Sequence, residues 1–476
     1  MKKALWLTSM SLAGALTLAG CGGNGGDENG NDTNGNNVNA GNDGGEENAD
    51  ASGDDEEIEL TFWHIETGYG EEEMESAVDR FEENNPNVTV EVVQHENDPY
   101  KTNFNVAMGG GNPPDVFHSW GGGWLQNFVD AGLVRNLTDE IDPDHYLDAA
   151  LSVATYDDEI YGAPLGMDTV LVWYNERIFD EYGFEEPETY DEFTDIVDTL
   201  QGDDIIPLTL ANQPQWPGAF YLMYFAERLG GVDLFDEAFT RDGRGFDDEA
   251  YVEAGEMIQE LVEMNAFPDG FNGMDYDTGQ SRQLMYGDRA AMEIMGNWMV
   301  GATRDDAPEF EDDLGYFIFP EIEGGEGSNN NIVGGVSPVF SVTEESEHGE
   351  LAAELVQELT SLETAEAFAN ADAEISAIHG VEYEDEFTAE LAELLEGAEE
   401  VQTFYDQTLP SQMAEVHLNT TQALFGLSMT PEEAAQEMEE AAEEYLDGEG
   451  ADIEDELDDV SDEDVEELEE EMNNNE

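Results

Sequence analysis

YGAPLGMDTVLVWYN, residues 161–175, contains one charged side chain, Asp168, in a chain of 476 residues that carries 117 acidic and 12 basic side chains. The stretch opens with the turn-forming residues Gly162 and Pro164 and continues as an apolar run of strand-like composition. A nearly uncharged segment in so acidic a chain predicts a strand buried between two folded bodies, with Asp168 at their junction. The alternative is an ordinary core strand that follows a turn.

The composition limits the possible function classes. A chain of 476 residues is long enough for two or three domains with a sizeable core. Its hydrophobic content of 39% excludes a wholly disordered acidic chain, despite the formal net charge of −105. Such charge repels itself in dilute buffer, whereas molar salt shortens the Debye length to about 3 Å. The composition therefore predicts a protein of a very salty environment, and it argues against nucleic-acid binding.

The N-terminus has the features of a secretory signal. Two lysines precede a mostly apolar run, residues 4–18, which ends in Leu18-Ala19-Gly20-Cys21. This ending resembles the lipobox of prokaryotic lipoproteins, which implies removal of residues 1–20 and attachment of lipid to Cys21. An uncleaved anchor helix is the alternative, but the apolar run is short for a membrane span. Because Cys21 is the only cysteine, no internal disulfide is possible.

Two polar segments flank the expected folded region. Residues 21–57 are rich in Gly, Asn and acidic side chains and predict a flexible tether. Residues 448–476 are almost entirely acidic and predict a solvated, disordered tail. A metal-binding segment is the alternative for the tail, but it lacks the spacing of a calcium-binding EF-hand loop.

The region between these segments has the pattern of an α/β protein. Strands are expected at 58–63, 88–93 and 115–118, and helices at 71–84, 100–108 and 125–131. Long acidic helices are expected over 346–400. A final helix is expected to begin at Thr430, with Pro431 at its first helical position.

Several short motifs, taken in order, carry a resemblance to a known family. They are NPNVTV at 85–90, GGNPPDV at 110–116, AGLVRNLT at 131–138, YGAP at 161–164, PETYDEF at 187–193, GDRAAM at 287–292 and GNW at 296–298. The set resembles the family 1 extracellular solute-binding proteins, which are the substrate receptors of ABC importers, mostly for sugars. Tyr190 stands where the family usually has Trp. The resemblance extends from about residue 58 to 447.

The resemblance implies a two-lobe α/β fold of the periplasmic-binding-protein type II class, with a hinge and an interlobe cleft. Lobe 1 is expected to comprise 58–165 plus 300–345, and lobe 2 to comprise 166–299 plus 346–447. The implied function is capture of a neutral sugar or oligosaccharide by hinge closure and its delivery to ABC permease subunits. We expect a monomer without cofactor or metal, at the extracellular face of the membrane or in the periplasm.

Sugar binding requires aromatic faces for the pyranose ring and carboxylates, amides or backbone groups for its hydroxyls. Such groups should follow strand ends that face the cleft. Trp298 is the strongest candidate, because the resemblance places a stacking aromatic there. The full set of expected ligand contacts is His64, Glu66, Ser119, Trp120, Asp168, Tyr174, Trp216, Asn297, Trp298 and Gly335. Each has a core or hinge role as its alternative, and the scarcity of Arg and Lys in these loops disfavours anionic ligands.

An enzyme is disfavoured, because the sequence has no nucleophile elbow, P-loop or Rossmann glycine pattern and its seven histidines lack metal-ligand spacing. Two other functions stay open: a surface sugar receptor or adhesin without transport, and a secreted polysaccharide-acting enzyme. The absence of a twin-arginine signal favours a halophilic bacterium over an archaeon.

Overall fold

A computed structural model describes residues 57–203 and 205–446. The expected signal segment 1–20, Cys21, the tether apart from Glu57, and the tail 448–476 lie outside the described residues. None of the described helices has the length and apolarity that a membrane span requires.

The first lobe is built on a sheet with the strand order β2-β1-β3-β12-β6. Strands β2, β1 and β3 are parallel, whereas β12 runs antiparallel to β3 and β6. The elements of this lobe are β1 (Ile58–His64), α1 (Gly68–Asn84), β2 (Val88–Gln94), α2 (Asn97–Gly109), β3 (Val116–Ser119), α3 (Gly122–Asp130), α4 (Asp148–Ser152), β4 (Thr155–Tyr156), β5 (Glu159–Ile160), β6 (Ala163–Pro164), β12 (Val339–Val342), α12 (Gly349–Leu359) and α13 (Leu362–Asp372). The strands and helices expected over 58–131 are confirmed, with ends that differ by a few residues.

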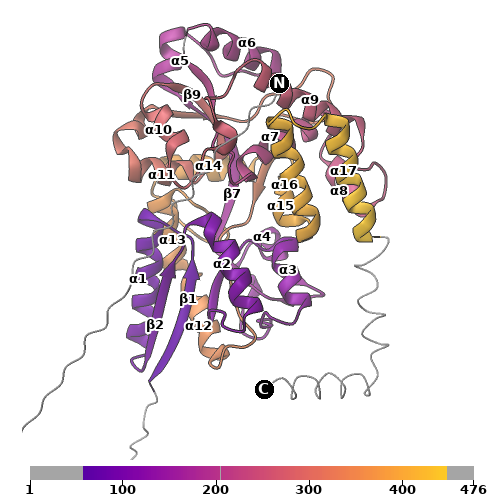
Figure 1. The fold of residues 1–476 in the computed structure, drawn as a ribbon. Coiled ribbons are helices and arrows are strands. Elements are labelled where there is room, and N and C mark those ends of the chain that lie inside the picture. The colour runs from indigo at the N-terminus through magenta and orange to yellow at the C-terminus, as the bar shows by residue number, and fades with distance from the viewer. Residues whose placement is uncertain (1–56, 204, 447–476) are drawn as a thin grey trace, which may run out of the picture. The chain divides into compact units, whose positions relative to one another are not determined.

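Helices cover both faces of this sheet (Figure 1). On one face α1 buries Met74, Ala77, Val78 and Phe81, whose spacing of three and four residues places them on one side of the helix. Helices α12 and α13 pack beside α1 in the same core. On the other face α2 and α3 form a separate, largely aromatic core around Phe104.

The second lobe is built on a sheet with the strand order β14-β11-β7-β9-β8, to which β10 and β13 add by pairing with β7. Its elements are β7 (Gly166–Asn175), α5 (Glu176–Tyr182), α6 (Tyr190–Gln201), β8 (Ile206–Thr209), α7 (Trp216–Gly230), α8 (Asp233–Thr240), α9 (Glu249–Glu263), α10 (Gln280–Tyr286), β9 (Ala290–Gly296), α11 (Met299–Asp306), β10 (Leu314–Phe317), β11 (Ile332–Gly335), β13 (Ile375–Ser376), α14 (Glu386–Glu396), β14 (Val401–Thr403), α15 (Tyr405–Thr408), α16 (Ser411–Phe425) and α17 (Pro431–Glu444). Helix α17 begins as expected: Thr430 and Glu433 form a capping box around Pro431.

The opening stretch of sequence is the first connection between the lobes. Strand β6 belongs to the first sheet and β7 to the second, so the chain crosses at Leu165. Every residue of β7 except Met167 is buried, and the strand pairs with β9, β10, β11 and β13. The predicted buried crossing is therefore confirmed, and the low charge of this stretch follows from its burial.

The later boundaries of the lobes differ from those expected. The chain crosses back at 336–338, between β11 of the second sheet and β12 of the first, and again after α13, within 373–385. Residues 300–335 thus lie in lobe 2, not in lobe 1, and α12 and α13 lie in lobe 1, not in lobe 2. The stretch expected to be helical throughout, 346–400, is interrupted by this last crossing and by β13.

One charged side chain lies in the middle of the second sheet. Glu293 of β9 is fully buried, and its burial raises its pKa from 4.5 to about 7, although Ser281 and the charge of Arg282 favour the ionised form. A carboxyl whose pKa is raised in the folded state makes its full contribution to the free energy of unfolding below its unfolded pKa. That stability is lost as the pH rises from 4.5 to about 7.

We therefore expect Glu293→Gln to become progressively more stable than the wild type across this pH range. The difference in the free energy of unfolding should grow by roughly 3 kcal/mol between pH 4.5 and pH 7 and stay constant above it. Chemical denaturation of both proteins at a series of pH values, in molar KCl, measures this difference. A difference that does not change with pH would show that Glu293 stays ionised in the fold.

Candidate functional site

A cavity of about 430 Å³ lies between the two lobes. Both lobes contribute to its lining: Ile65 and Trp120 come from lobe 1, and Trp298 comes from lobe 2. Asp168, Ser337 and Glu374 lie in or shortly after the three crossings and line it as well. The volume is in the range of small-molecule sites in proteins. The loops after β1, β3 and β9 reach the cavity, as expected for an α/β protein that binds ligands at strand ends.

Aromatic rings from lobe 2 form one side of this cavity. The indole N–H of Trp298 donates a hydrogen bond to the hydroxyl of Tyr276 at 2.9 Å. The ring of Trp216 lies edge-on to Tyr276 at 4.7 Å between centroids, and Phe220 and Phe404 continue the surface. Gly296 ends β9 next to this group, and a methyl group in its place would overlap the ring of Trp298. The indoles are thus held in place while part of each remains accessible.

Trp120 lines the same cavity from lobe 1. The ammonium of Lys101 lies 4.6 Å from the centre of the Trp120 ring and 3.8 Å from Asp406 Oδ2. Lys101 belongs to α2 of lobe 1 and Asp406 to α15 of lobe 2, so this ion pair bridges the two lobes beside the cavity. The only lysine after the third residue of the chain thus lines the cavity.

Carboxyl groups gather where the crossings meet. Asp168 and Glu374 are each 5% exposed, and Glu66 and Asp372 lie nearby. Burial raises the pKa of Asp168 well above its usual range, and the negative charge of Glu66 adds to this effect. Burial and the charges of Asp168, Asp372 and Glu66 likewise raise the pKa of Glu374, while the backbone N–H of Met167 opposes the shift.

Five of the ten predicted contact residues line the cavity: Glu66, Trp120, Asp168, Trp216 and Trp298. Glu66 also lies next to His118 behind the cavity, with its Oε1 3.3 Å from His118 Nδ1. The fold therefore brings together three residues that were selected after strand ends, Asp168 from the predicted crossing, and Trp216.

The other five predicted residues do not line the cavity, and four of them hold the structure around it. His64 is fully buried against Phe62, one position before the lining residue Ile65. The hydroxyl of Ser119 donates to the backbone of Val339, which ties β3 to β12. Asn297 and Gly335 support the rim of the cavity.

Asn297 is buried, and its side-chain oxygen accepts a hydrogen bond from the backbone N–H of Thr169 at 2.9 Å. Gly335 pairs with Asp168 across β11 and β7, and a methyl group on it would overlap the ring of Phe404. Both residues thus position groups that line the cavity, instead of lining it themselves.

Tyr174 is the residue placed farthest from expectation. Its hydroxyl donates to Glu186 at 3.0 Å, and its ring packs on Phe179 at the other end of β7. It lies six residues beyond Asp168, so an extended strand carries it about 20 Å from that residue. Tyr174 borders a separate surface hollow next to Glu186, not the interlobe cavity.

Several lining residues were not predicted: Lys101, Phe220, Tyr276, Arg282, Asp372, Glu374, Phe404, Asp406 and Gln407. Lys101 could have been identified from the sequence, because it is the only lysine after residue 3. Residues 404–407 spell FYDQ, an aromatic, acidic and amide cluster after a long acidic region, which is a second signal in the sequence. Among the described residues, no group of three or more His, Cys, Asp or Glu is arranged to hold a metal ion.

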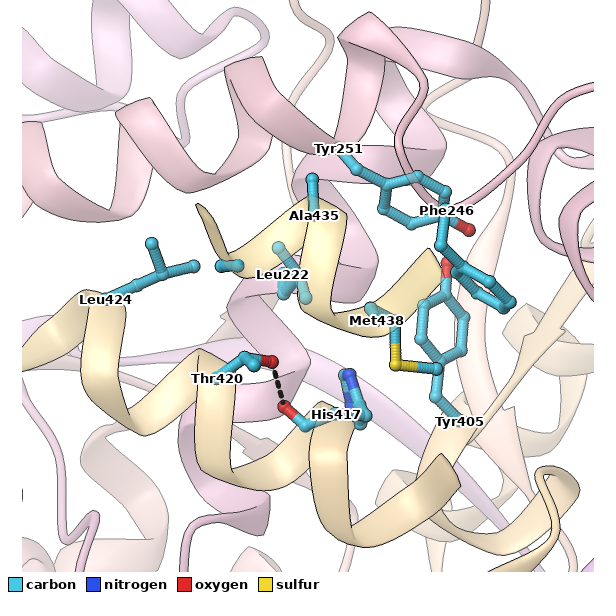
Figure 2. A pocket seen from close by; sticks show the side chains of 10 residues that line it. Leu222, Phe246, Tyr251, Tyr405, His417, Thr420, Leu424, Ala435 and Met438 are labelled. Atoms are coloured by element: carbon cyan, nitrogen blue, oxygen red, sulfur yellow. Dashed lines mark hydrogen bonds between the residues drawn. The ribbon is translucent and has the colours of Figure 1, made fainter. Parts of the chain in front are cut away.

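A second enclosed space lies inside lobe 2, among α7, α9, α16 and α17 (Figure 2). Its volume of about 20 Å³ has room for little more than one water molecule. Figure 2 shows His417 and Met438 facing it beside Tyr405. Burial lowers the pKa of His417 to about 3, so the ring is neutral there. This space is a packing defect of the core and cannot hold a sugar.

The sequence and the fold both match known proteins. Residues 66–366 match the family described as bacterial extracellular solute-binding protein, which is more than half of the chain. The chain belongs to this family. Membership in a family of binding proteins agrees with the expectation that the protein is not an enzyme.

Individual relatives of this solute-binding protein are distant. It is 22% identical to the multiple sugar-binding protein of Streptococcus mutans serotype c, over 65% of this chain and 72% of that one. It is 27% identical to the galactooligosaccharide-binding protein of Bacillus subtilis strain 168, over 66% of this chain and 71% of that one. A structure from work on xylan utilization by the thermophilic bacterium Caldanaerobius polysaccharolyticus has a TM-score of 0.75 at 27% identity, covering 80% of this chain and 99% of that one. The expected two-lobe fold is confirmed.

The buried bond of Asn297 gives a direct test of its role. We expect Asn297→Ala to lower the free energy of unfolding by about 1–3 kcal/mol, because the N–H of Thr169 would lose its acceptor inside the protein. The matched control Asn330→Ala changes an exposed asparagine and should stay within about 0.5 kcal/mol of the wild type. Denaturation in molar KCl measures both. Unchanged stability in Asn297→Ala, combined with lost ligand affinity, would instead make Asn297 a ligand contact.

Proposed function

We propose that this protein captures a sugar or oligosaccharide outside the cell in the cavity between its lobes and delivers it to the membrane permease of an ABC transporter. The observation that carries this proposal is the pairing of a concentrated aromatic surface, built around Trp216 and Trp298, with carboxylates at the crossings. A pyranose presents apolar ring faces to such rings and hydroxyl groups to such oxygens. The names of the relatives, a multiple sugar-binding and a galactooligosaccharide-binding protein, support this class of ligand.

The charged side chains that line the cavity restrict the class of ligand further. Nine carboxyl groups and two cationic side chains line it. Both cations are already paired, since Lys101 lies beside Asp406 and Arg282 donates to Asp306 at 3.3 Å. A phosphorylated or carboxylated ligand would meet net repulsion and would find these cations engaged. We therefore propose a saccharide without negative charge, a class that includes the neutral ligand expected from the sequence.

Closure of the two lobes is the proposed means of capture. Three crossing segments connect the lobes, which is the arrangement of a hinge. Contacts between lobes flank the cavity: the Lys101–Asp406 pair lies beside it, and the amide of Asn127 in α3 donates to Ser411 in α16 at 2.6 Å. The Asn127–Ser411 bond is exposed and Lys101 is partly exposed, although Asp406 is 8% exposed, so we propose that these contacts form and break as the lobes move.

The parts of the chain outside the described residues complete the proposal. Lipid attached to Cys21 would hold the protein on the outer face of the membrane. The tether 21–57 would give the binding lobes reach, and the acidic tail would stay solvated. We propose a monomer from a halophilic bacterium, since the excess of carboxylates suits a salty medium.

We expect Trp298→Ala to weaken saccharide binding by about 2 kcal/mol, or roughly 30-fold, because the sugar would lose a fixed aromatic face. Trp216→Ala should have an effect in the same direction. Calorimetry in molar KCl against a broad panel of mono- and oligosaccharides identifies a ligand first and then compares the variants.

The matched control for these variants is Tyr182→Ala, which removes an aromatic ring on α5 outside the cavity. Its ring stacks on Phe184 at 5.4 Å, so it tests a loss of aromatic packing without a change in the site. The control should bind the ligand like the wild type. Equal affinity in Trp298→Ala and the wild type would remove the aromatic surface from the binding site.

The salt dependence of the fold tests the proposed habitat. We expect the melting temperature of the mature chain to rise steadily between 0.1 and 3 M KCl, because screening relieves the repulsion among carboxylates. Scanning calorimetry at several salt concentrations measures this. A melting temperature that is constant over the range would contradict a halophilic protein.

A further inference from the structure

The carboxyl groups at the crossings differ from the acids on the surface. Surface carboxylates are solvated, and in a chain of this composition they need no individual explanation. Asp168 and Glu374 are 95% removed from solvent and line the cavity from two separate crossing segments. Two buried groups of like charge in one place cost free energy unless a cation or a proton compensates them.

Glu374 also has an unmet hydrogen-bonding group. One part of its carboxylate accepts from the backbone N–H of Met167. Its Oε1 has no hydrogen-bond partner among the residues that the structure describes. The Glu374 side chain lines the cavity, and buried oxygens are normally paired. A donor on a bound ligand would supply the missing hydrogen bond.

The cationic side chains near Asp168 and Glu374 are paired with other acids. Lys101 lies against Asp406 and Trp120, and Arg282 is bound to Asp306. Arg304 attracts Asp372 over some distance, but its guanidinium donates to Glu311 at 2.8 Å and lies 3.1 Å from Asp385. Within the described part of the chain, these pairs leave the charges of Asp168 and Glu374 without a protein counterion.

Glycines make room for the carboxylates. A methyl group on Gly166 would overlap Oε1 of Glu374, and one on Gly301 would overlap the carboxylate of Asp372. The carboxylates of Glu374 and Asp372 are therefore packed against glycine backbone, and a side chain at either glycine would displace them. The site is shaped around these groups, and its negative charge does not follow from the overall composition alone.

We propose that Asp168 and Glu374 bind the protonated amine of an amino sugar, so that the preferred ligand is a saccharide with an unacetylated amino group. This inference rests on the proposed function and adds the chemical class of the sugar. An ammonium group supplies three donors and one positive charge to a site that offers an unpaired acceptor and uncompensated acids. The rings of Trp216 and Trp298 remain available for the sugar faces.

The arrangement favours an organic ammonium over a metal ion. Metal ions require several ligands that converge at short distance, and the described residues contain no such group of His, Cys, Asp and Glu. An ammonium group on a sugar ring is held by hydrogen bonds and needs no such convergence. Molar salt screens exposed charges strongly but buried pairs much less, so the attraction persists in a salty medium.

The experiment compares saccharides that differ only in the substituent at carbon 2 of each sugar unit. Calorimetry of the mature protein in molar KCl would use glucosamine, galactosamine and mannosamine against glucose, galactose and mannose. It would also compare the β-1,4-linked disaccharides of glucosamine, of N-acetylglucosamine and of glucose. We expect an amine-bearing ligand to bind about 10- to 100-fold tighter than its hydroxyl or acetylated counterpart.

Isosteric variants assign this preference to the two acids. Glu374→Gln and Asp168→Asn keep the side-chain size but remove the charge, and each should reduce the preference for the amine to less than about threefold. Glu256→Gln makes the same change on an exposed residue of α9 outside the cavity and should keep the full preference. Thermal unfolding of each variant confirms that it is folded.

Each result decides the inference. Tighter binding of a hydroxyl or acetylated sugar than of its amine counterpart would overturn it and leave the proposed sugar-binding function intact. An amine preference that persists in Glu374→Gln and Asp168→Asn would also overturn it, since the amine would be recognised elsewhere. A complete absence of binding to any saccharide would contradict the proposed function itself.

Discussion

The structure depends on a single buried strand, β7, that also carries a carboxyl group, Asp168, near its first residue. Strand β7 pairs with β13 at its start, with β11 and β9 in its middle and with β9 and β10 toward its end, so residues 170–174 are all buried and are apolar or aromatic. The hydroxyl of Tyr224 donates to its backbone at Val170, and the indole of Trp173 donates to the carbonyl of Met295. Asp168 is the exception at the end that faces the other lobe. Its position is fixed by the whole sheet, because any displacement of Asp168 requires movement of β7.

The local features of the fold could be predicted from the sequence, because they depend on neighbouring residues. The apolar face of α1, the cap at Thr430 and the crossing at Leu165 each appear in a short window. Three of the predicted cavity residues, Glu66, Trp120 and Trp298, follow the same rule, since they stand just beyond strand ends. Tyr174 failed because the number of residues along a strand sets its distance from Asp168, which composition does not reveal. Glu374 and Phe404 were missed because they reach the cavity only after the chain returns from lobe 1.

The rare cations of this chain have structural roles, and this explains the charge of the cavity. Arg228 is buried in lobe 2 and donates to the backbone carbonyl groups of Phe319 and Asn331. Arg177 bridges Asp288 and Asp313, both at 2.7 Å. Each of these two arginines ties separate segments of lobe 2 together. The acids that face the cavity therefore have few cations to pair with, and their compensation must come from protons or from the ligand.

The position of the carboxyl groups links ligand chemistry to lobe movement. Asp168 follows the first crossing, Ser337 belongs to the second, and Glu374 belongs to the third, and all three line the cavity. A ligand that contacts them touches every segment on which the lobes would turn. Because a ligand can shift a conformational equilibrium only by its differential affinity for the two states, contacts at the hinge segments are effective ones. In the proposed function, the aromatic surface of lobe 2 would contribute affinity within one lobe. Contacts to the acids at the crossings would depend on lobe orientation, and they would connect recognition of the ligand to closure of the lobes.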